Sequence, residues 1–104
     1  MRAKLHDIAH ARTGDKGDTS TLSVFPYRDE HYLDLVRELT SEAVRRHLST
    51  HIRGEVIRYE LPNVCALQFV CRRSLDGGVT TSLALDTHGK SLSSRLLSLE
   101  IDLP

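Results

Sequence analysis

The chain has 104 residues, of which 39% are hydrophobic and 27% are charged, and these proportions are typical of a single globular domain over residues 1–104. Its 14 basic and 14 acidic side chains cancel, and a net charge of zero argues against nucleic acid as a partner. No apolar stretch is long enough to span a membrane, and the N-terminus lacks the apolar core of a signal peptide. The composition therefore predicts a cytoplasmic protein without a membrane partner.

Residues 3–11, AKLHDIAHA, are predicted to form the first strand, although their apolar residues also fit a short helix. In a strand, the even-numbered residues from Lys4 to Arg12 would form the more polar side. Residues 21–25, TLSVF, are predicted to form the second strand, which ends at Pro26 because proline has no amide hydrogen to donate to a sheet. The intervening sequence GDKGD is expected to form a turn.

Residues 29–48 carry apolar side chains at intervals of three and four, which is typical of an amphipathic helix. Asp29 is a suitable N-cap for this helix. Thr40 is suitable as the N-cap of a second helix, and in that case the segment divides in two. Gly54 is expected to end the helical region.

Residues 55–61, EVIRYEL, alternate between apolar and polar side chains, which predicts a strand with one face in water. The apolar face would hold Ile57, Tyr59 and Leu61, and the face in water would hold Arg58 and Glu60.

Residues 63–78 are ambiguous. Asn63 as an N-cap and Gly77 as a C-terminal cap favour a helix, while the apolar run within the segment also fits a buried strand. We expect the helix. Residues 79–86 are then predicted to form a strand, residues 86–90 a turn, and the sequence LSSRLLSLEIDL a short helical turn followed by a terminal strand.

This order of elements predicts an α+β fold. Strands in one layer, covered on one face by two main helices, form a two-layer sandwich with a mostly antiparallel sheet. The ferredoxin-like arrangement is the commonest small form of such a sandwich, and it is the fold we expect.

No metal and no cofactor are assigned from the sequence. His6 and His10 have the spacing of zinc ligands on a helix, but on a strand they would lie about 13 Å apart, too far for one ion. Cys65 and Cys71 match neither a redox pair nor a zinc knuckle. Nucleotide-binding glycine motifs and the nucleophilic elbow of serine hydrolases are also absent.

The GDKGD sequence is the strongest candidate for chemistry. Gly14 and Gly17 permit backbone conformations in which successive amides converge on an anion, and Lys16 adds a positive charge. Asp15 and Asp18 oppose an anion, and their carboxylates also fit a purely structural turn. The residues alone leave both alternatives open.

Four stretches together resemble a known family: AHARTGDKGDTSTLSVF, YELPNVCALQFV, LDGGVTTSLALDTHGKSL and the terminal LEIDLP. From about Leu5 to Pro104 the chain is similar to the C-terminal domain of the acyclic terpene utilisation protein A family, the AtuA-like ferredoxin-fold domain. The string AHARTGDKGD is the most specific part of the resemblance. Where the family pattern usually has an asparagine after GDKGD, this chain continues with Thr19.

The resemblance implies a ferredoxin-like fold and a link to the breakdown of acyclic terpenes. In that family the domain commonly follows a much larger domain. It implies here an accessory subunit or domain that associates with that larger domain, encoded separately and acting on acyl-CoA or related activated acids. On this interpretation the functional loop consists of His10, Arg12, Gly14, Asp15, Lys16, Gly17 and Asp18.

In that loop Gly14 and Gly17 would set the backbone, while Lys16 and Arg12 would meet an anionic group. Asp15 or Asp18 would fix the loop or bind polar groups of a partner.

Two alternatives remain. The first is a small independent enzyme in which Asp15, Lys16 and His10 perform acid and base chemistry, with His10 facing the GDKGD loop. A sandwich of this size has little room for an enclosed pocket, so such a site would lie at a dimer interface. The second is a structural module that forms a homo-oligomer through its open sheet face or an edge strand.

Overall fold

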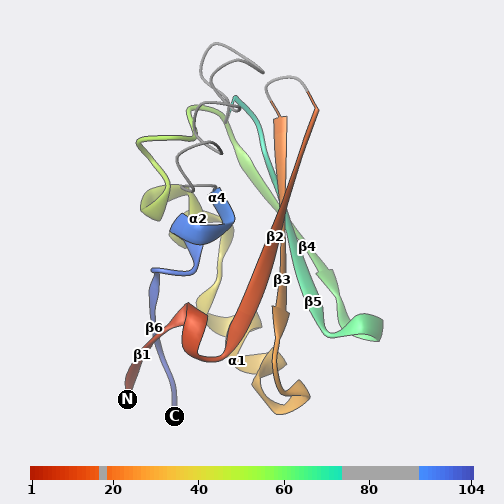
Figure 1. The fold of residues 1–104 in the computed structure, drawn as a ribbon, viewed down its shortest axis with the longest axis vertical. Helices are drawn as coiled ribbons and strands as arrows, with labels where there is room; N and C mark the ends of the chain where they lie inside the picture. Colours follow the sequence, from red (N-terminus) through yellow and green to blue (C-terminus); the bar gives the residue numbers. More distant parts are fainter. Residues whose placement is uncertain (17–18, 74–91) are drawn as a thin grey trace.

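The computed structural model describes residues 1–16, 19–73 and 92–104 (Figure 1). Its strands are β1 (Arg2–Lys4), β2 (Ala9–Lys16), β3 (Thr19–Pro26), β4 (Val56–Leu61), β5 (Ala66–Cys71) and β6 (Glu100–Asp102). Its α-helices are α1 (Tyr32–Glu38), α2 (Ser41–His47) and α4 (Leu92–Leu96). In the described residues, β2, β3, β5 and β4 form one antiparallel sheet in that order, and β1 pairs with β6 in a second sheet.

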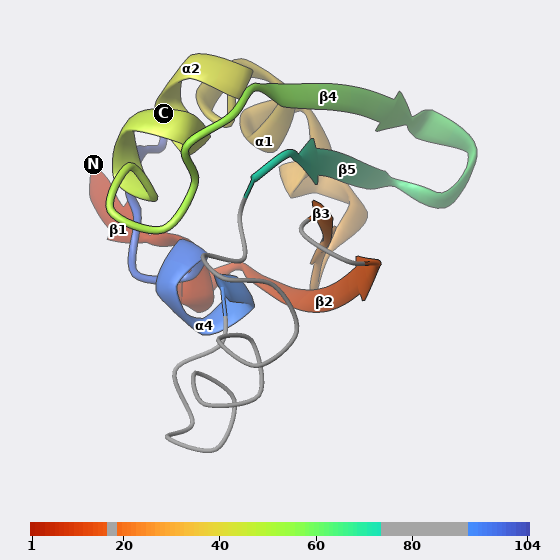
Figure 2. The same cartoon turned by 90° about the horizontal axis from the view of Figure 1, so that it is seen from above.

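The helices lie on one side of the four-stranded sheet (Figure 2). Between the two layers is a core of buried aliphatic side chains around Phe69. The opposite side of the sheet carries no described helix. The α+β fold class with an antiparallel sheet and a helical layer is therefore confirmed, and it is consistent with a ferredoxin-like fold.

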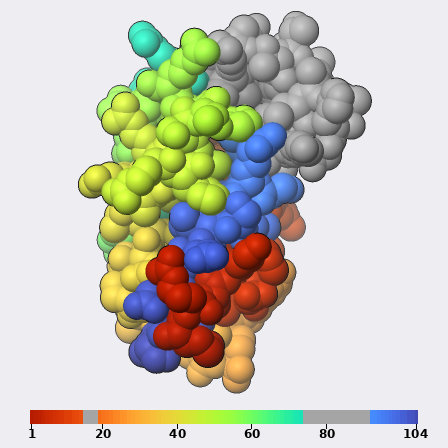
Figure 3. Space-filling view, turned by 90° about the vertical axis from the view of Figure 1, so that its left-hand side faces the viewer, coloured from red at the N-terminus to blue at the C-terminus, as the bar shows by residue number. Residues whose placement is uncertain are grey.

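The N-terminal segment forms two strands and not the single strand predicted. A 3-10 turn at Leu5–Asp7 separates β1 from β2, and it is fixed where a carboxylate oxygen of Asp7 accepts a hydrogen bond from the amide of Lys4 at 3.2 Å. The turn buries Leu5 completely and lets the chain pass from the β1–β6 sheet into the four-stranded sheet. Figure 3 shows the terminal segments side by side at the helical side of the molecule.

The turn predicted over residues 14–18 is shorter than expected. Strand β2 continues through Gly14 and Asp15 to Lys16, which pairs with Thr19 of β3, so that only residues 17 and 18 lie between the strands. Those two residues lie outside the described part of the chain. Gly14 pairs with Thr21, and a Cβ atom at Gly14 would lie 2.9 Å from the Thr21 hydroxyl oxygen. Glycine therefore leaves room for the threonine side chain.

The helical region divides in two at Thr40, which is one of the two alternatives that its sequence left open. The Thr40 hydroxyl accepts a hydrogen bond from the amide of Ala43 at 3.0 Å and caps α2. Asp29 is not an N-cap but the first residue of a 3-10 turn. Gly54 lies well after the end of α2, and its amide donates to the carbonyl oxygen of Arg72 at 3.1 Å. Gly54 therefore does not cap a helix, but forms part of the contact between the segment before β4 and the segment after β5.

The helix expected over residues 63–78 is wrong for residues 63–73, and residues 74–78 lie outside the described part of the chain. A 3-10 turn at Pro62–Val64 leads into β5, which is hydrogen-bonded to β3 on one side and β4 on the other. Leu67, Phe69 and Cys71 alternate into the core, and burial raises the pKa of the Cys71 thiol to about 12. The pairing on both sides satisfies the backbone of an apolar run that also fits a helix. The predictions for residues 79–86 and 86–90 lie outside the described residues, whereas α4 and β6 agree with the predicted helical turn and terminal strand.

Strand β4 is present as predicted, but its two faces are reversed. Arg58 pairs with the buried Phe69, and its guanidinium donates to the backbone oxygens of Val36 at 2.7 Å and Leu39 at 3.0 Å. These carbonyls lie at the C-terminal end of α1, where helical carbonyls lack intrahelical partners. The face bearing Ile57, Tyr59 and Leu61 consequently points away from the helices.

Candidate functional site

The face of the four-stranded sheet that points away from the helices is called the outer face. Residues paired directly across antiparallel strands share a face, so the register defines its rows. One row crosses all four strands as Arg12, Ser23, Gln68 and Tyr59, and the next as Gly14, Thr21, Val70 and Ile57. In the first row the Gln68 amide donates to the Ser23 hydroxyl at 3.4 Å.

Three aromatic rings gather around the start of β2. The imidazole of His10 stacks on the rings of Phe25 and Tyr27, with centroid distances of 5.3 Å in both cases and interplanar angles of 21° and 23°. Stacking at this distance holds the rings in a preferred relative orientation. His10, half-buried, is thus part of an aromatic cluster on the outer face.

The predicted functional loop is spread along one edge strand. His10, Arg12 and Gly14 alternate along β2 and share the outer face, while the backbones of Asp15 and Lys16 pair with Ser20 and Thr19. At about 3.3 Å per residue, the backbones of His10 and Lys16 lie about 20 Å apart, so His10 is at the opposite end of β2 from the turn. Gly17 and Asp18 lie outside the described residues. The structure therefore groups three of the predicted residues on one face and places His10 away from the turn.

Several large apolar side chains are exposed at the His10 end of the outer face and in the adjoining turn between β4 and β5. The exposed fractions are 63% for Tyr27, 49% for Tyr59, 40% for Leu61 and 63% for Val64. Val64 is the last residue of the turn that joins β4 to β5, and this turn begins directly after Leu61. Together with Phe25, these side chains are called the apolar patch. This patch was not predicted from the sequence, because the alternation in β4 suggested that Tyr59 and Leu61 were core residues.

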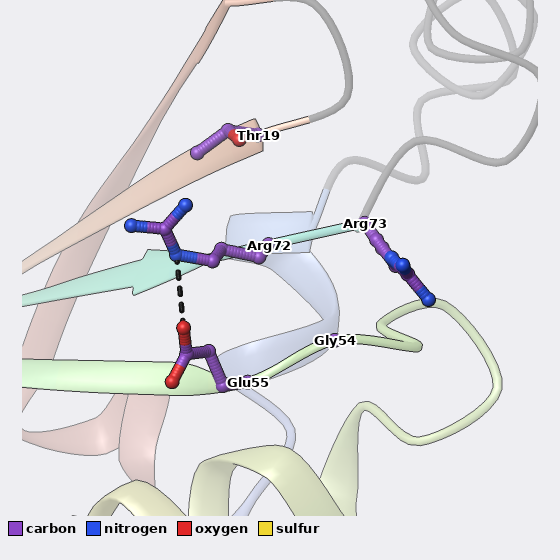
Figure 4. Close-up of a pocket in the computed structure, with 5 residues that line it drawn as sticks. All are labelled: Thr19, Gly54, Glu55, Arg72 and Arg73. Atoms are coloured by element: carbon purple, nitrogen blue, oxygen red, sulfur yellow. Dashed lines mark ion pairs between the residues drawn. The ribbon is translucent and has the colours of Figure 1, made fainter.

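The opposite end of the sheet is hollowed and cationic. An open hollow of about 460 Å³ is lined by Thr19, Gly54, Glu55, Arg72 and Arg73 (Figure 4). The sequence alone does not distinguish Arg72 and Arg73 from ordinary surface arginines. These two arginines differ from other surface arginines because they directly follow β5, a central strand, and lie beside Thr19, the residue that follows the GDKGD sequence.

Residues 3–102 match the AtuA ferredoxin-like domain. The chain belongs to this family. No curated protein and no solved structure matches it.

The described part of this AtuA ferredoxin-like chain offers open surfaces and not an enclosed metal centre. Within residues 1–16, 19–73 and 92–104, no three His, Cys, Asp or Glu side chains come together as metal ligands. His6 lies in the first 3-10 turn, 3.2 Å from the carboxylate of Asp7, and on a different element from His10. None of the described helices combines the length and hydrophobicity needed to cross a bilayer.

Proposed function

We propose that this AtuA ferredoxin-like chain is an accessory subunit or domain of an acyclic terpene utilisation system. It would bind, through its outer face, a separately encoded larger protein of the same family that acts on acyl-CoA or related activated acids. The family membership supports the kind of system. The apolar patch supports binding of a protein partner.

The reversed orientation of β4 is the observation that carries this proposal. Arg58 is turned inward to the end of α1, which leaves Tyr59 and Leu61 exposed on a sheet face that no described helix covers. Apolar side chains gathered on an exposed face mark sites of protein association, and tyrosine is enriched at such sites. Arg12, exposed in the row of Tyr59, supplies a charged rim to the same surface.

Association with a larger partner also accounts for the distribution of the predicted loop. His10, Arg12 and Gly14 line one edge of the outer face and do not surround a common point. Such an arrangement suits contact with an extended surface better than acid and base chemistry on one small molecule. The same face would serve a second copy of the chain in the oligomerisation alternative, so the experiment must separate the two partners.

Tyr59→Glu and its matched control test the proposal. Glutamate at position 59 places a charge within the proposed interface, at a side chain already half-exposed and therefore tolerant of substitution. Leu33→Glu makes the same kind of change on α1, where Leu33 is 73% exposed on the helical side. The molar mass of each variant would be measured by light scattering, alone and mixed with the larger family protein.

The wild type and Leu33→Glu are expected to form a complex with the larger protein, and Tyr59→Glu is not. Absence of a complex with the wild type would exclude the accessory role. A wild-type homodimer that the larger protein does not dissociate, and that Tyr59→Glu abolishes, would assign the face to oligomerisation instead.

A further inference from the structure

The hollow at the cationic end of the sheet is built from three separate segments. Thr19 begins β3, Gly54 and Glu55 precede β4, and Arg72 and Arg73 follow β5. Three backbone hydrogen bonds join the last two segments: Arg53 to Arg73 at 3.1 Å, Gly54 to Arg72 at 3.1 Å and Arg72 to Glu55 at 3.0 Å. The positions from which the two arginine side chains extend are thus fixed by the sheet.

Close backbone contact keeps the hollow in this form. A Cβ atom at Gly54 would lie 2.6 Å from the carbonyl oxygen of Arg72, so glycine is needed for the two segments to approach. Arg73 has a φ angle of 52°, a left-handed conformation that is uncommon for residues other than glycine. The chain turns at Arg73 and sends its side chain away from that of Arg72, so that the two lie on different sides of Gly54 (Figure 4).

The guanidinium of Arg72 has donors to spare. Its Nε lies 3.1 Å from a carboxylate oxygen of Glu55, while its two Nη groups extend past Glu55 on the side of Thr19 (Figure 4). Among the described residues, the Nη groups of Arg72 and the guanidinium of Arg73 have no hydrogen-bond acceptor. The five lining residues within the described part of the chain carry two positive charges and one negative charge, a net positive charge among them.

We propose that this hollow binds a phosphorylated small molecule through its diphosphate or phosphate group. The Nη groups of Arg72 present the planar pair of donors that matches two phosphate oxygens, and Arg73 supplies a second charge. The Thr19 hydroxyl is a further donor at the same opening. A volume of about 460 Å³ accommodates more than an isolated phosphate. This binding would be a property of the chain alone and does not depend on the larger partner.

Titration with pyrophosphate at constant ionic strength tests the proposal. Binding would be followed by calorimetry and by the backbone amide resonances of the ¹⁵N-labelled protein. Saturable binding is expected, with the largest amide shifts at Gly54, Glu55 and Arg72. Arg72→Gln should weaken binding by about tenfold, because it removes a charge-assisted hydrogen bond, and Arg73→Gln should weaken it less, because it removes only a positive charge whose side chain points away from that of Arg72. Glu55→Gln should strengthen it severalfold, since it removes the competing carboxylate.

Arg28→Gln is the matched control. Arg28 is an exposed arginine paired with a single carboxylate, Glu30, at 2.9 Å, just as Arg72 is paired with Glu55, but it lies outside the hollow. Its substitution should leave pyrophosphate binding unchanged. Binding that does not saturate, or that falls equally in Arg28→Gln and Arg72→Gln, would overturn the proposal. Weaker binding by Glu55→Gln would do so as well, and thermal unfolding of each variant checks that it is folded.

Discussion

Arg58 donates a hydrogen bond from strand β4 to the backbone oxygen of Val36 in helix α1, at 2.7 Å. The same nitrogen donates to Leu39 at 3.0 Å, and only 20% of the Arg58 side chain is exposed. A charged side chain thus links the sheet to the helical layer at a point where an apolar residue would leave carbonyl groups without donors.

Arg58→Met is expected to lower the free energy of unfolding by about 2 kcal/mol, because two carbonyl groups lose a charged donor while the side-chain volume is kept. Arg46→Met is the control, since Arg46 is 74% exposed and forms an ion pair with Glu42 at 3.0 Å on the surface of α2. It should change stability by less than about 0.5 kcal/mol. Urea denaturation of both variants measures the difference, and equal losses would contradict the assigned role of Arg58.

Two aromatic residues on neighbouring strands test the assignment of faces. Phe69 of β5 is fully buried under the helices, whereas Tyr59 of β4 is 49% exposed on the outer face. Phe69→Ala is expected to cost about 3–5 kcal/mol, and Tyr59→Ala less than about 1 kcal/mol. Chemical denaturation compares the two. A cost for Tyr59→Ala as large as that for Phe69→Ala would mean that β4 faces the other way.

The sequence predicted best those features that depend on neighbouring residues. The cap at Thr40 and the strand over residues 55–61 arise from hydrogen bonds and alternation within a few positions, and both are present. The helix expected for the segment from Asn63 onward is absent because an apolar run fits helix and strand equally. Which one forms here was decided by β3, far away in the chain, whose Leu22 pairs with Phe69.

The orientation of β4 was also beyond local prediction. Alternation identifies two faces but not which face is buried. Here the donors required at the end of α1 are supplied by Arg58, so its face turns inward. The same limit applies to the candidate site. Alternation alone predicts that His10 and Arg12 share one side of β2. The proximity of Thr19 to Arg72 depends on pairing between distant strands and could not be predicted locally.

The two glycines with close neighbours should respond differently to alanine. At Gly54 the added Cβ would lie 2.6 Å from the backbone oxygen of Arg72, which cannot move without breaking the hydrogen bond from Gly54. Gly54→Ala is therefore expected to cost about 2 kcal/mol of unfolding free energy. At Gly14 the clash at 2.9 Å is with the side-chain oxygen of Thr21, which rotation about χ1 can relieve.

Gly14→Ala is accordingly expected to cost less than about 1 kcal/mol. That cost should disappear when Gly14→Ala is combined with Thr21→Ala, because the clashing hydroxyl oxygen is then absent. Denaturation of the single and double variants completes the comparison. A Gly14→Ala cost that persists in the double variant would show that the backbone of Gly14, and not the space above it, requires glycine.

His51 gives the fold a dependence on pH. Burial, assisted by the positive charge of Arg95, lowers the pKa of His51 below its usual range. The unfolded chain therefore binds a proton at higher pH than the folded one does, and the stability associated with neutral His51 is complete above about pH 6.5. As the pH falls through that value, this contribution to stability decreases. The decrease ends once the pH is below the pKa of His51 in the folded state. The unfolding free energy should decrease more between about pH 7.5 and about pH 5.5 for the wild type than for His51→Gln. An equal decrease in the two proteins would contradict this role of His51.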